Sequence, residues 1–108
     1  MRSLSDETHE WVMALFVDDR LYLLSVEMIS KGSIGSASVP INKLLIRAWE
    51  NGAKGFFLAH NHPGGDTTPS ADDVRVTKRI ALVAEACDLQ LLRHVVISAH
   101  GMTDVGGW

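Results

Sequence analysis

The stretch "AKGFFLAHNHPGGDTTPSADDVRVTKR", residues 53–79, places a strand, a loop and the start of a helix in direct succession. Its first seven residues are almost continuously apolar, which is typical of a short interior strand. A loop rich in histidine, proline and glycine follows, and Pro69-Ser70 then introduces apolar residues at helical spacing. The stretch therefore predicts a buried strand that ends in polar side chains close to the start of the next helix.

The flanking segments extend this unit into a larger sheet. Strands are predicted over 13–17, 21–26, 53–59 and 89–98, and helices over 40–52 and 70–89. The segment "KGSIGSASVP", residues 31–40, is compatible with either an edge strand or a loop. This order of elements predicts an α/β fold of the α+β type, in which helices flank a single mixed β-sheet.

Length and composition indicate one globular domain over residues 1–108, with residues 1–10 as a lead-in. The chain is 46% hydrophobic and 21% charged, with a net charge of −3, which disfavours a nucleic-acid partner bound through phosphates. The single cysteine excludes an internal disulfide and fits a reducing compartment. Neither a signal-peptide core nor a membrane-length apolar run occurs, so we expect a cytoplasmic protein without a membrane partner.

The two histidines at the end of the central strand suggest a metal site. His60 and His62 are two residues apart, so on a strand their side chains point to the same face. The glycine-rich turn returns the chain to a helix whose first turn carries Asp72 and Asp73. Two imidazoles and one carboxylate form a three-ligand set that leaves the fourth position of Zn²⁺ for water. By spacing alone, either aspartate could be the third ligand.

Simpler roles exist for several of these residues. A His-x-His pair also occurs in solvated loops, and Asp66 is expected only to hold its turn. Ser70 and Asp73 fit a capping box, in which both side chains bind backbone N–H groups at the start of the helix. The occurrence of paired imidazoles, turn-forming glycines and an acidic helix start in one loop nevertheless favours a metal site.

The spacing His60-x-His62-x7-Ser70-x2-Asp73 resembles the JAMM signature of the JAB/MPN metalloproteases. The longer string "AHNHPGGDTTPSADDVRVTKR" is similar to the RadC branch of that superfamily, as are "VEMISKGSIGSASVP" and "LLRHVVIS". The similarity extends over nearly the whole chain from about Trp11. It implies the MPN/JAB architecture, which is cytidine-deaminase-like.

The resemblance also implies roles for individual residues. His60, His62 and Asp73 would be the zinc ligands, and Asp73 is thereby preferred over its neighbour. Glu27 would be the catalytic glutamate that deprotonates the attacking water, and Ser70 would stabilise the oxyanion of the tetrahedral intermediate. The residues alone do not single out Glu27, and the other glutamates, including the one at position 10, are weaker candidates.

Three further side chains receive structural expectations. Trp49 is expected in the core, on the inner stripe of its helix, and Cys87 as a small core residue of the second helix. His94 is expected to be a partly buried strand histidine. Arg93 replaces an acid that often precedes that histidine in the family. The resemblance therefore does not imply that His94 supports a metal ligand.

The leading hypothesis is a zinc-dependent metallohydrolase that cleaves a peptide or isopeptide bond in a peptide or protein substrate. Residues 31–40 could present a backbone edge to that substrate. The alternative is a DNA-repair-associated accessory or interaction module of the RadC family with a structural or vestigial metal site, and a metallo-nuclease is a third reading. The complete set of motif residues favours the hydrolase. A homodimer is compatible with the resemblance.

Overall fold

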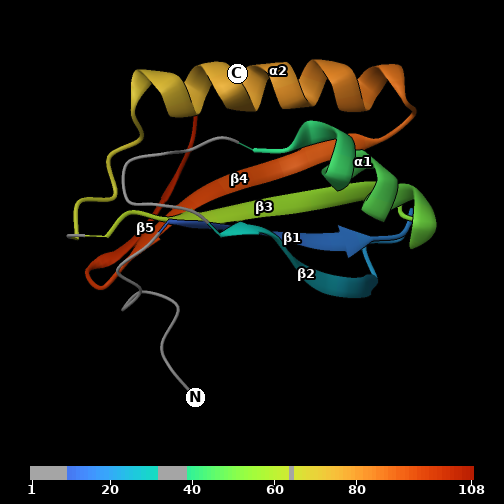
Figure 1. Cartoon of the computed structure of the whole chain (residues 1–108), viewed down its shortest axis with the longest axis horizontal. Coiled ribbons are helices and arrows are strands. Elements are labelled where there is room, and N and C mark those ends of the chain that lie inside the picture. Colours follow the sequence, from blue (N-terminus) through green and yellow to red (C-terminus); the bar gives the residue numbers. More distant parts are fainter. Residues whose placement is uncertain (1–9, 32–38, 64) are drawn as a thin grey trace.

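The computed structural model describes residues 10–31, 39–63 and 65–108 (Figure 1). Their elements are β1 (Trp11–Val17), β2 (Leu23–Lys31), α1 (Ile41–Glu50), β3 (Gly55–Asn61), α2 (Ala71–Ala86), β4 (Gln90–Ser98) and β5 (Gly101–Asp104). The strands form one sheet in the order β2-β1-β3-β4-β5. Only the pairing of β3 with β4 is parallel. The predicted mixed sheet with flanking helices is thus confirmed as a compact α+β fold consistent with the JAB/MPN architecture.

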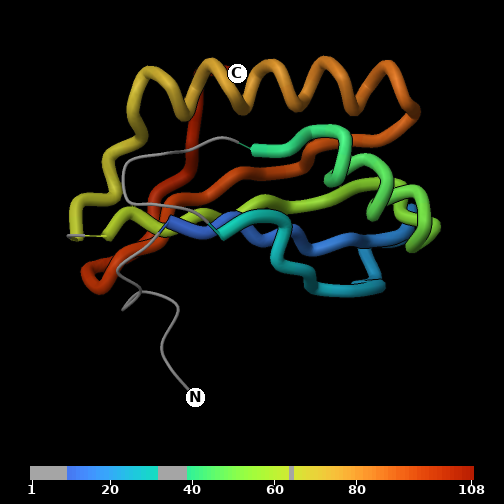
Figure 2. Tube along the Cα trace, in the orientation of Figure 1, coloured from blue at the N-terminus to red at the C-terminus, as the bar shows by residue number. Residues whose placement is uncertain are grey.

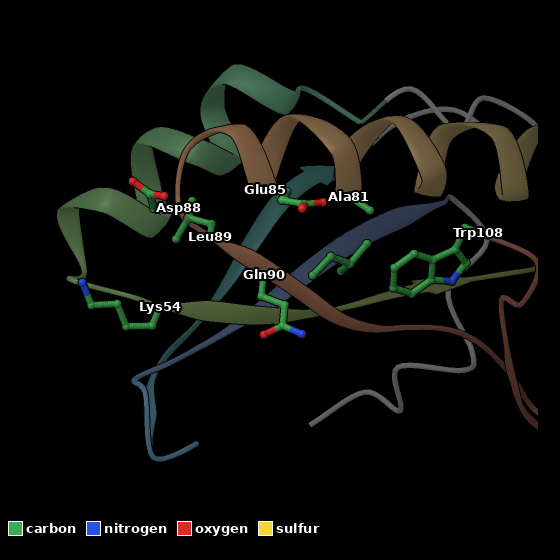
Figure 3. Close-up of a pocket in the computed structure, with 8 residues that line it drawn as sticks. Lys54, Ala81, Glu85, Asp88, Leu89, Gln90 and Trp108 are labelled. Atoms are coloured by element: carbon green, nitrogen blue, oxygen red, sulfur yellow. The ribbon is translucent and has the colours of Figure 1, made fainter.

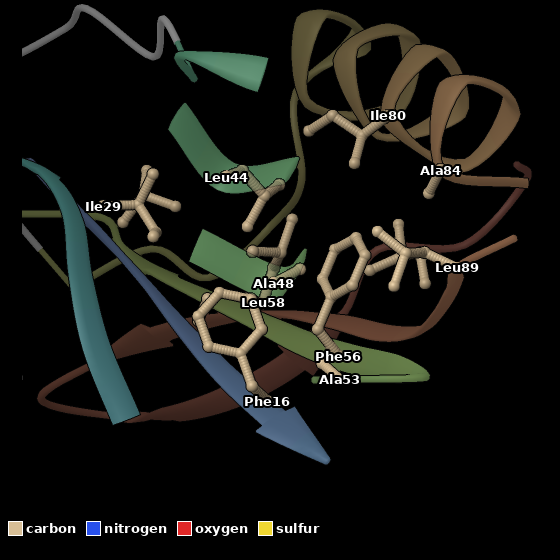
Figure 4. Packing of buried hydrophobic residues seen from close by; sticks show 13 residues of the cluster. Phe16, Ile29, Leu44, Ala48, Ala53, Phe56, Leu58, Ile80, Ala84 and Leu89 are labelled. Atoms are coloured by element: carbon tan, nitrogen blue, oxygen red, sulfur yellow. The ribbon is translucent and has the colours of Figure 1, made fainter. Parts of the chain in front are cut away.

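Both helices lie on the same face of the sheet (Figures 1 and 2). Phe16 of β1 and Phe56 of β3 are fully buried there, with ring centroids 6.3 Å apart. Leu44 of α1 and Ile80 of α2 pack into the same cluster (Figure 4). Complete burial of side chains of this size contributes roughly 1.5–3 kcal/mol each. This core holds the start of α2 over the end of β3.

Helix α1 begins and ends where its punctuation predicts, but its inner stripe is narrower than expected. Leu44 and Ala48 are fully buried, whereas the predicted core residue Trp49 is 80% exposed. Successive helical residues differ by about 100° around the axis, so the neighbour of a buried alanine turns toward solvent. The core prediction for Cys87 is also wrong, because this residue is the exposed C-cap of α2. Trp11, by contrast, is 1% exposed.

The strand register brings the polar loop together with three other chain segments. Val12 of β1 and Val96 of β4 lie on either side of His60. Because β1 is antiparallel to β3, the first residues of β1 lie beside the last residues of β3. The start of α2 returns to this same edge (Figure 1). Side chains from β1, β3, β4 and α2 can therefore meet there.

One strand was not predicted from the sequence, and one prediction falls on residues that the structure does not describe. The segment after residue 98, for which no strand was predicted, contains β5, which pairs antiparallel with β4. The question of an edge strand near residue 36 falls on residues outside the described ranges. No helix in the described part of the chain is both long and apolar enough to cross a membrane.

Candidate metal centre

Three predicted ligands meet at the edge where β3 ends and α2 begins. Ligand atoms of His60, His62 and Asp73 all lie within 4.8 Å of one another. The two imidazole Nε2 atoms are 3.1 Å apart, and they lie 3.3 and 3.2 Å from the two carboxylate oxygens. His60 and Asp73 are 3% and 4% exposed, whereas His62 is partly exposed. The group is thus buried on one side and reaches solvent at His62.

A backbone carbonyl fixes the orientation of His62. Its Nδ1 lies 3.0 Å from the carbonyl oxygen of Asp66. A carbonyl only accepts hydrogen bonds, so Nδ1 carries the proton and the lone pair of Nε2 points at the other two ligands. Asp66 also holds its turn as predicted, since its Oδ1 accepts the N–H of Thr68 at 2.8 Å.

The loop that supplies this carbonyl is anchored to the far strands of the sheet. The Ser98 hydroxyl donates to the Gly65 carbonyl at 2.8 Å, and the Thr67 and Thr103 hydroxyls lie 2.6 Å apart. Gly65 has a φ of +98°, and a Cβ there would come within 2.6 Å of the His100 ring. Glycine at this position therefore lets the loop pack closely against the β4–β5 turn.

The Asp73 carboxylate takes part in the capping box and is also a candidate metal ligand. The Ser70 hydroxyl accepts the N–H of Asp73 at 3.0 Å, and the N–H of Ser70 donates to Asp73 Oδ2 at 2.8 Å. Burial acts to raise the pKa of Asp73, but the Ser70 hydrogen bonds and both histidines lower it below its ordinary value. Asp72 instead pairs with Arg75 on the exposed side of α2. The cap therefore aims an ionised Asp73 at the histidines.

Behind His60 lies a second buried histidine. This second histidine is His94, and its Nε2 lies 2.7 Å from Nδ1 of His60. The Nδ1 of His94 lies 2.7 Å from the Thr77 hydroxyl. The Thr77 hydroxyl donates to the Asp73 carbonyl at 2.6 Å. His94 is 3% exposed, so it is more deeply buried than the sequence suggests. Burial lowers the pKa of His60 to about 4, with His62 lowering it further and Asp73 opposing, so His60 is neutral at pH 7, the form that binds metals.

These donors fit a zinc ion. Two imidazole nitrogens and one carboxylate are the ligand types that Zn²⁺ prefers at catalytic sites. Their lone pairs point at one small region, and a cavity of about 10 Å³ beside His60 and Asp73 leaves little space behind them. Converging electron pairs repel unless a cation or proton lies between them. The residues therefore suit a small divalent cation.

Glu27, which the resemblance implies as the catalytic glutamate, does not reach this group. It lies level with Leu58 but two strands away, so its Cα is roughly 12 Å from that of His60. Its carboxylate accepts hydrogen bonds from Arg47 at 2.5 and 3.1 Å and from the Asn51 amide at 2.7 Å. The Arg47 hydrogen bonds lower the pKa of Glu27 to about 2. A carboxylate held in this way joins β2 to α1 and is a poor base.

We expect Glu27→Gln to reduce stability rather than activity. The folded pKa of about 2 lies below the ordinary value of 4.5, so Glu27 stabilises the fold above pH 4.5 and loses that effect as the pH falls toward 2. The variant should melt a few degrees lower at pH 7, since the ion pair is partly exposed and screened. Its melting curve should converge with that of the parent near pH 2. Glu50→Gln, which removes the other Arg47 partner, is the control and should change the pH profile less.

Glu10, unlike Glu27, lies on a chain segment next to the candidate ligands. It precedes β1, two residues before Val12, which pairs with His60. Its Oε2 is buried without a hydrogen-bond partner. Burial raises the pKa of Glu10, while the charge of His62 lowers it and that of Asp73 raises it, so this carboxyl lies within electrostatic range of the ligands. An acidic oxygen that lacks a hydrogen-bond partner, on a carboxyl within electrostatic range of His62 and Asp73, is a candidate acceptor for a bound water.

Asn61, between the two histidines, holds the chain next to Glu10. Its Oδ1 accepts the backbone N–H of Trp11 at 2.7 Å, and both residues are 1% exposed. This hydrogen bond joins the start of β1 to the end of β3. It therefore restrains the backbone that carries Glu10 beside the ligand group.

A surface cavity of about 560 Å³ lies away from these residues (Figure 3). Its lining includes Lys54, Glu85, Gln90 and Trp108. Lys54 precedes β3 and Gln90 begins β4, whereas His60 and His62 lie at the other end of β3. The cavity is therefore separate from the candidate metal centre.

Comparison with known proteins agrees with the fold. A family model described as the RadC-like JAB domain matches residues 1–105. A UPF0758 protein of Psychrobacter is 38% identical over 84% of this chain and 40% of its own length. UPF0758 proteins of Acidithiobacillus ferrooxidans and Flavobacterium johnsoniae are 35% and 36% identical, over 98% and 83% of this chain and 49% and 39% of their own lengths.

The chain thus spans less than half the length of these relatives. The family model, in contrast, covers nearly all of it, including both histidines and the capped aspartate. The chain belongs to the RadC-like JAB domain family.

Proposed function

We propose that this chain is a zinc-dependent hydrolase that cleaves an amide bond in a peptide or protein. The observation that carries the proposal is the convergence of His60, His62 and Asp73, each held by a partner outside the group. A buried set of two imidazoles and a carboxylate, with one side toward solvent, is typical of catalytic rather than structural zinc sites. The zinc would act as a Lewis acid and lower the pKa of water to about 7.

Glu10 is the residue we assign to proton transfer. Its unpartnered Oε2 could accept a proton from the attacking water and pass it to the leaving nitrogen. The raised pKa of Glu10 makes its carboxylate a better acceptor for the proton of the attacking water. Glu27 has no part in this chemistry.

Ser70 is the residue we assign to the oxyanion. Its hydroxyl oxygen accepts the Asp73 N–H, so the hydroxyl proton is left for another acceptor. Ser70 is also exposed, as a residue that contacts substrate must be. A donor to the developing oxyanion contributes a few kcal/mol to lowering the barrier, roughly 2.7–4 in measured cases.

The substrate, the assembly and the compartment are further parts of the proposal. The class we infer is a peptide or protein, and a nucleic acid is not favoured, since the net charge of −3 offers no general attraction for phosphates. A homodimer and a reducing, cytoplasmic setting remain our expectations for the chain.

The proposal is tested by incubating the zinc-loaded chain with a peptide library and with an isopeptide-linked substrate. We expect new amino termini to form, and their formation to stop when a chelator removes the metal and to resume when zinc returns. An oligonucleotide substrate is included in parallel. Cleavage of the oligonucleotide alone would identify a nuclease, and the absence of cleavage by a chain with bound zinc would contradict the hydrolase proposal.

A further inference from the structure

We propose that His94 and Thr77 are positioning residues that fix the tautomer of His60 and so direct its Nε2 at the metal. The inference rests on the proposed metal site, but it concerns hydrogen bonds within the chain itself. It assigns a positioning role to a histidine that was expected only to be a partly buried residue of its strand.

The hydrogen atoms available on Thr77, His94 and His60 determine which group donates in each hydrogen bond. The Thr77 hydroxyl has one proton, which it donates to the Asp73 carbonyl at 2.6 Å. It must therefore accept in its other contact, so Nδ1 of His94 is the donor across 2.7 Å. The Nε2 of a neutral His94 then has a lone pair, which accepts from Nδ1–H of His60 at 2.7 Å. The remaining nitrogen, Nε2 of His60, is left with the lone pair that a metal needs.

The surroundings of His94 keep it in the neutral form that this arrangement requires. His94 and Thr77 are 3% and 0% exposed, so bulk water does not replace either partner. The hydrogen-bond partners of His94 are a hydroxyl and a second imidazole, neither of which carries a negative charge that would stabilise an imidazolium. A buried nitrogen that lost its partner would keep its full desolvation cost. The described contacts therefore favour one proton arrangement.

The same chain of hydrogen bonds joins two ligands that come from different elements. His60 is on β3 and Asp73 is in the first turn of α2, and His94 on β4 connects them through Thr77. Because Thr77 binds the carbonyl of Asp73, a shift of the first turn of α2 would disturb both ligands together. The positioning pair thus couples the orientation of an imidazole to the placement of a carboxylate.

Two pairs of variants of the full chain test the proposal through zinc affinity, measured by competition with a chelator. His94→Phe fills the space but accepts no hydrogen bond, and we expect roughly 10- to 100-fold weaker zinc binding. His94→Gln offers an amide oxygen to His60 and should recover most of the affinity. Thr77→Val should weaken binding, whereas Thr77→Ser, which keeps the hydroxyl, should not. Thermal unfolding shows whether each variant folds.

The proton positions are read directly in the zinc-free parent by long-range ¹H–¹⁵N NMR of the imidazoles. We expect His60 and His94 both to carry their protons on Nδ1. A proton on Nε2 of His60, unchanged zinc affinity in folded His94→Phe, or equal losses in Thr77→Val and Thr77→Ser would overturn the proposal. If the parent itself bound no zinc, the proposed function would fail, and the NMR result would still decide the hydrogen-bond arrangement.

Discussion

Replacing Glu10 by glutamine is expected to lower kcat for amide hydrolysis by roughly 10²- to 10⁴-fold, the usual contribution of a general acid–base residue. Glutamine keeps the size of the side chain but cannot take a proton from water. Because Glu10 is not one of the three converging ligands, the variant should still bind zinc. The measurement is single-turnover cleavage of the best library peptide, with bound zinc determined in the same samples.

Glu27→Gln is the matched control for this experiment. The same chemical change is made in a glutamate whose carboxylate is bound by Arg47 and Asn51. It should retain turnover at pH 7 at a temperature where the variant is folded. Full activity of Glu10→Gln, or loss of activity in folded Glu27→Gln, would exchange the roles assigned to these two residues.

The second large effect is expected from His62→Ala, which removes a ligand that is only partly buried and so disturbs the core least. Loss of a residue that only hydrogen-bonds a metal ligand typically weakens metal binding by roughly 10- to 100-fold. Zinc affinity should fall by more than this in His62→Ala, since a proposed ligand itself is lost. Turnover should fall with it. Chelator competition measures the affinity, and thermal unfolding confirms the fold.

His100→Ala serves as the control for loss of an imidazole near the same loop. His100 is exposed and packs beside Gly65, outside the ligand group. Its removal should leave zinc affinity close to that of the parent. Tight zinc binding by His62→Ala would mean that the ion is held elsewhere.

The sequence alone predicts the grouping of the three candidate ligands well because they are close together in the chain. His60, His62 and Asp73 fall within one strand–loop–helix unit, whose punctuation by glycine and proline is local. Spacing alone allowed either Asp72 or Asp73 as the third ligand. The fold favours Asp73, because the capping box turns its carboxylate inward while Asp72 points to solvent.

The glutamate could not be chosen from local signals. Glu10 is some fifty residues from the histidines in the chain, and its segment lies near them only because β1 runs antiparallel to β3. Pairing between distant strands depends on the whole sheet, and propensity does not encode it. The available signal was an acid directly before a buried strand, which becomes informative once the two strands are known to be neighbours.

Helix periodicity also has limits that Trp49 illustrates. The residue fits an apolar stripe beside Ala48, but the stripe that contacts the sheet is narrower than the pattern. The role proposed for His94 likewise depends on β4 lying next to β3, with Thr77 above both. Each of these positions is determined by packing between elements.

Calorimetric titration of the metal-free chain with zinc at pH 7 tests the central claim most directly. We expect saturable binding of one zinc ion per chain, because the chain presents one group of three converging candidate ligands in its described part. The absence of saturable binding by the folded chain at excess zinc would contradict the claim.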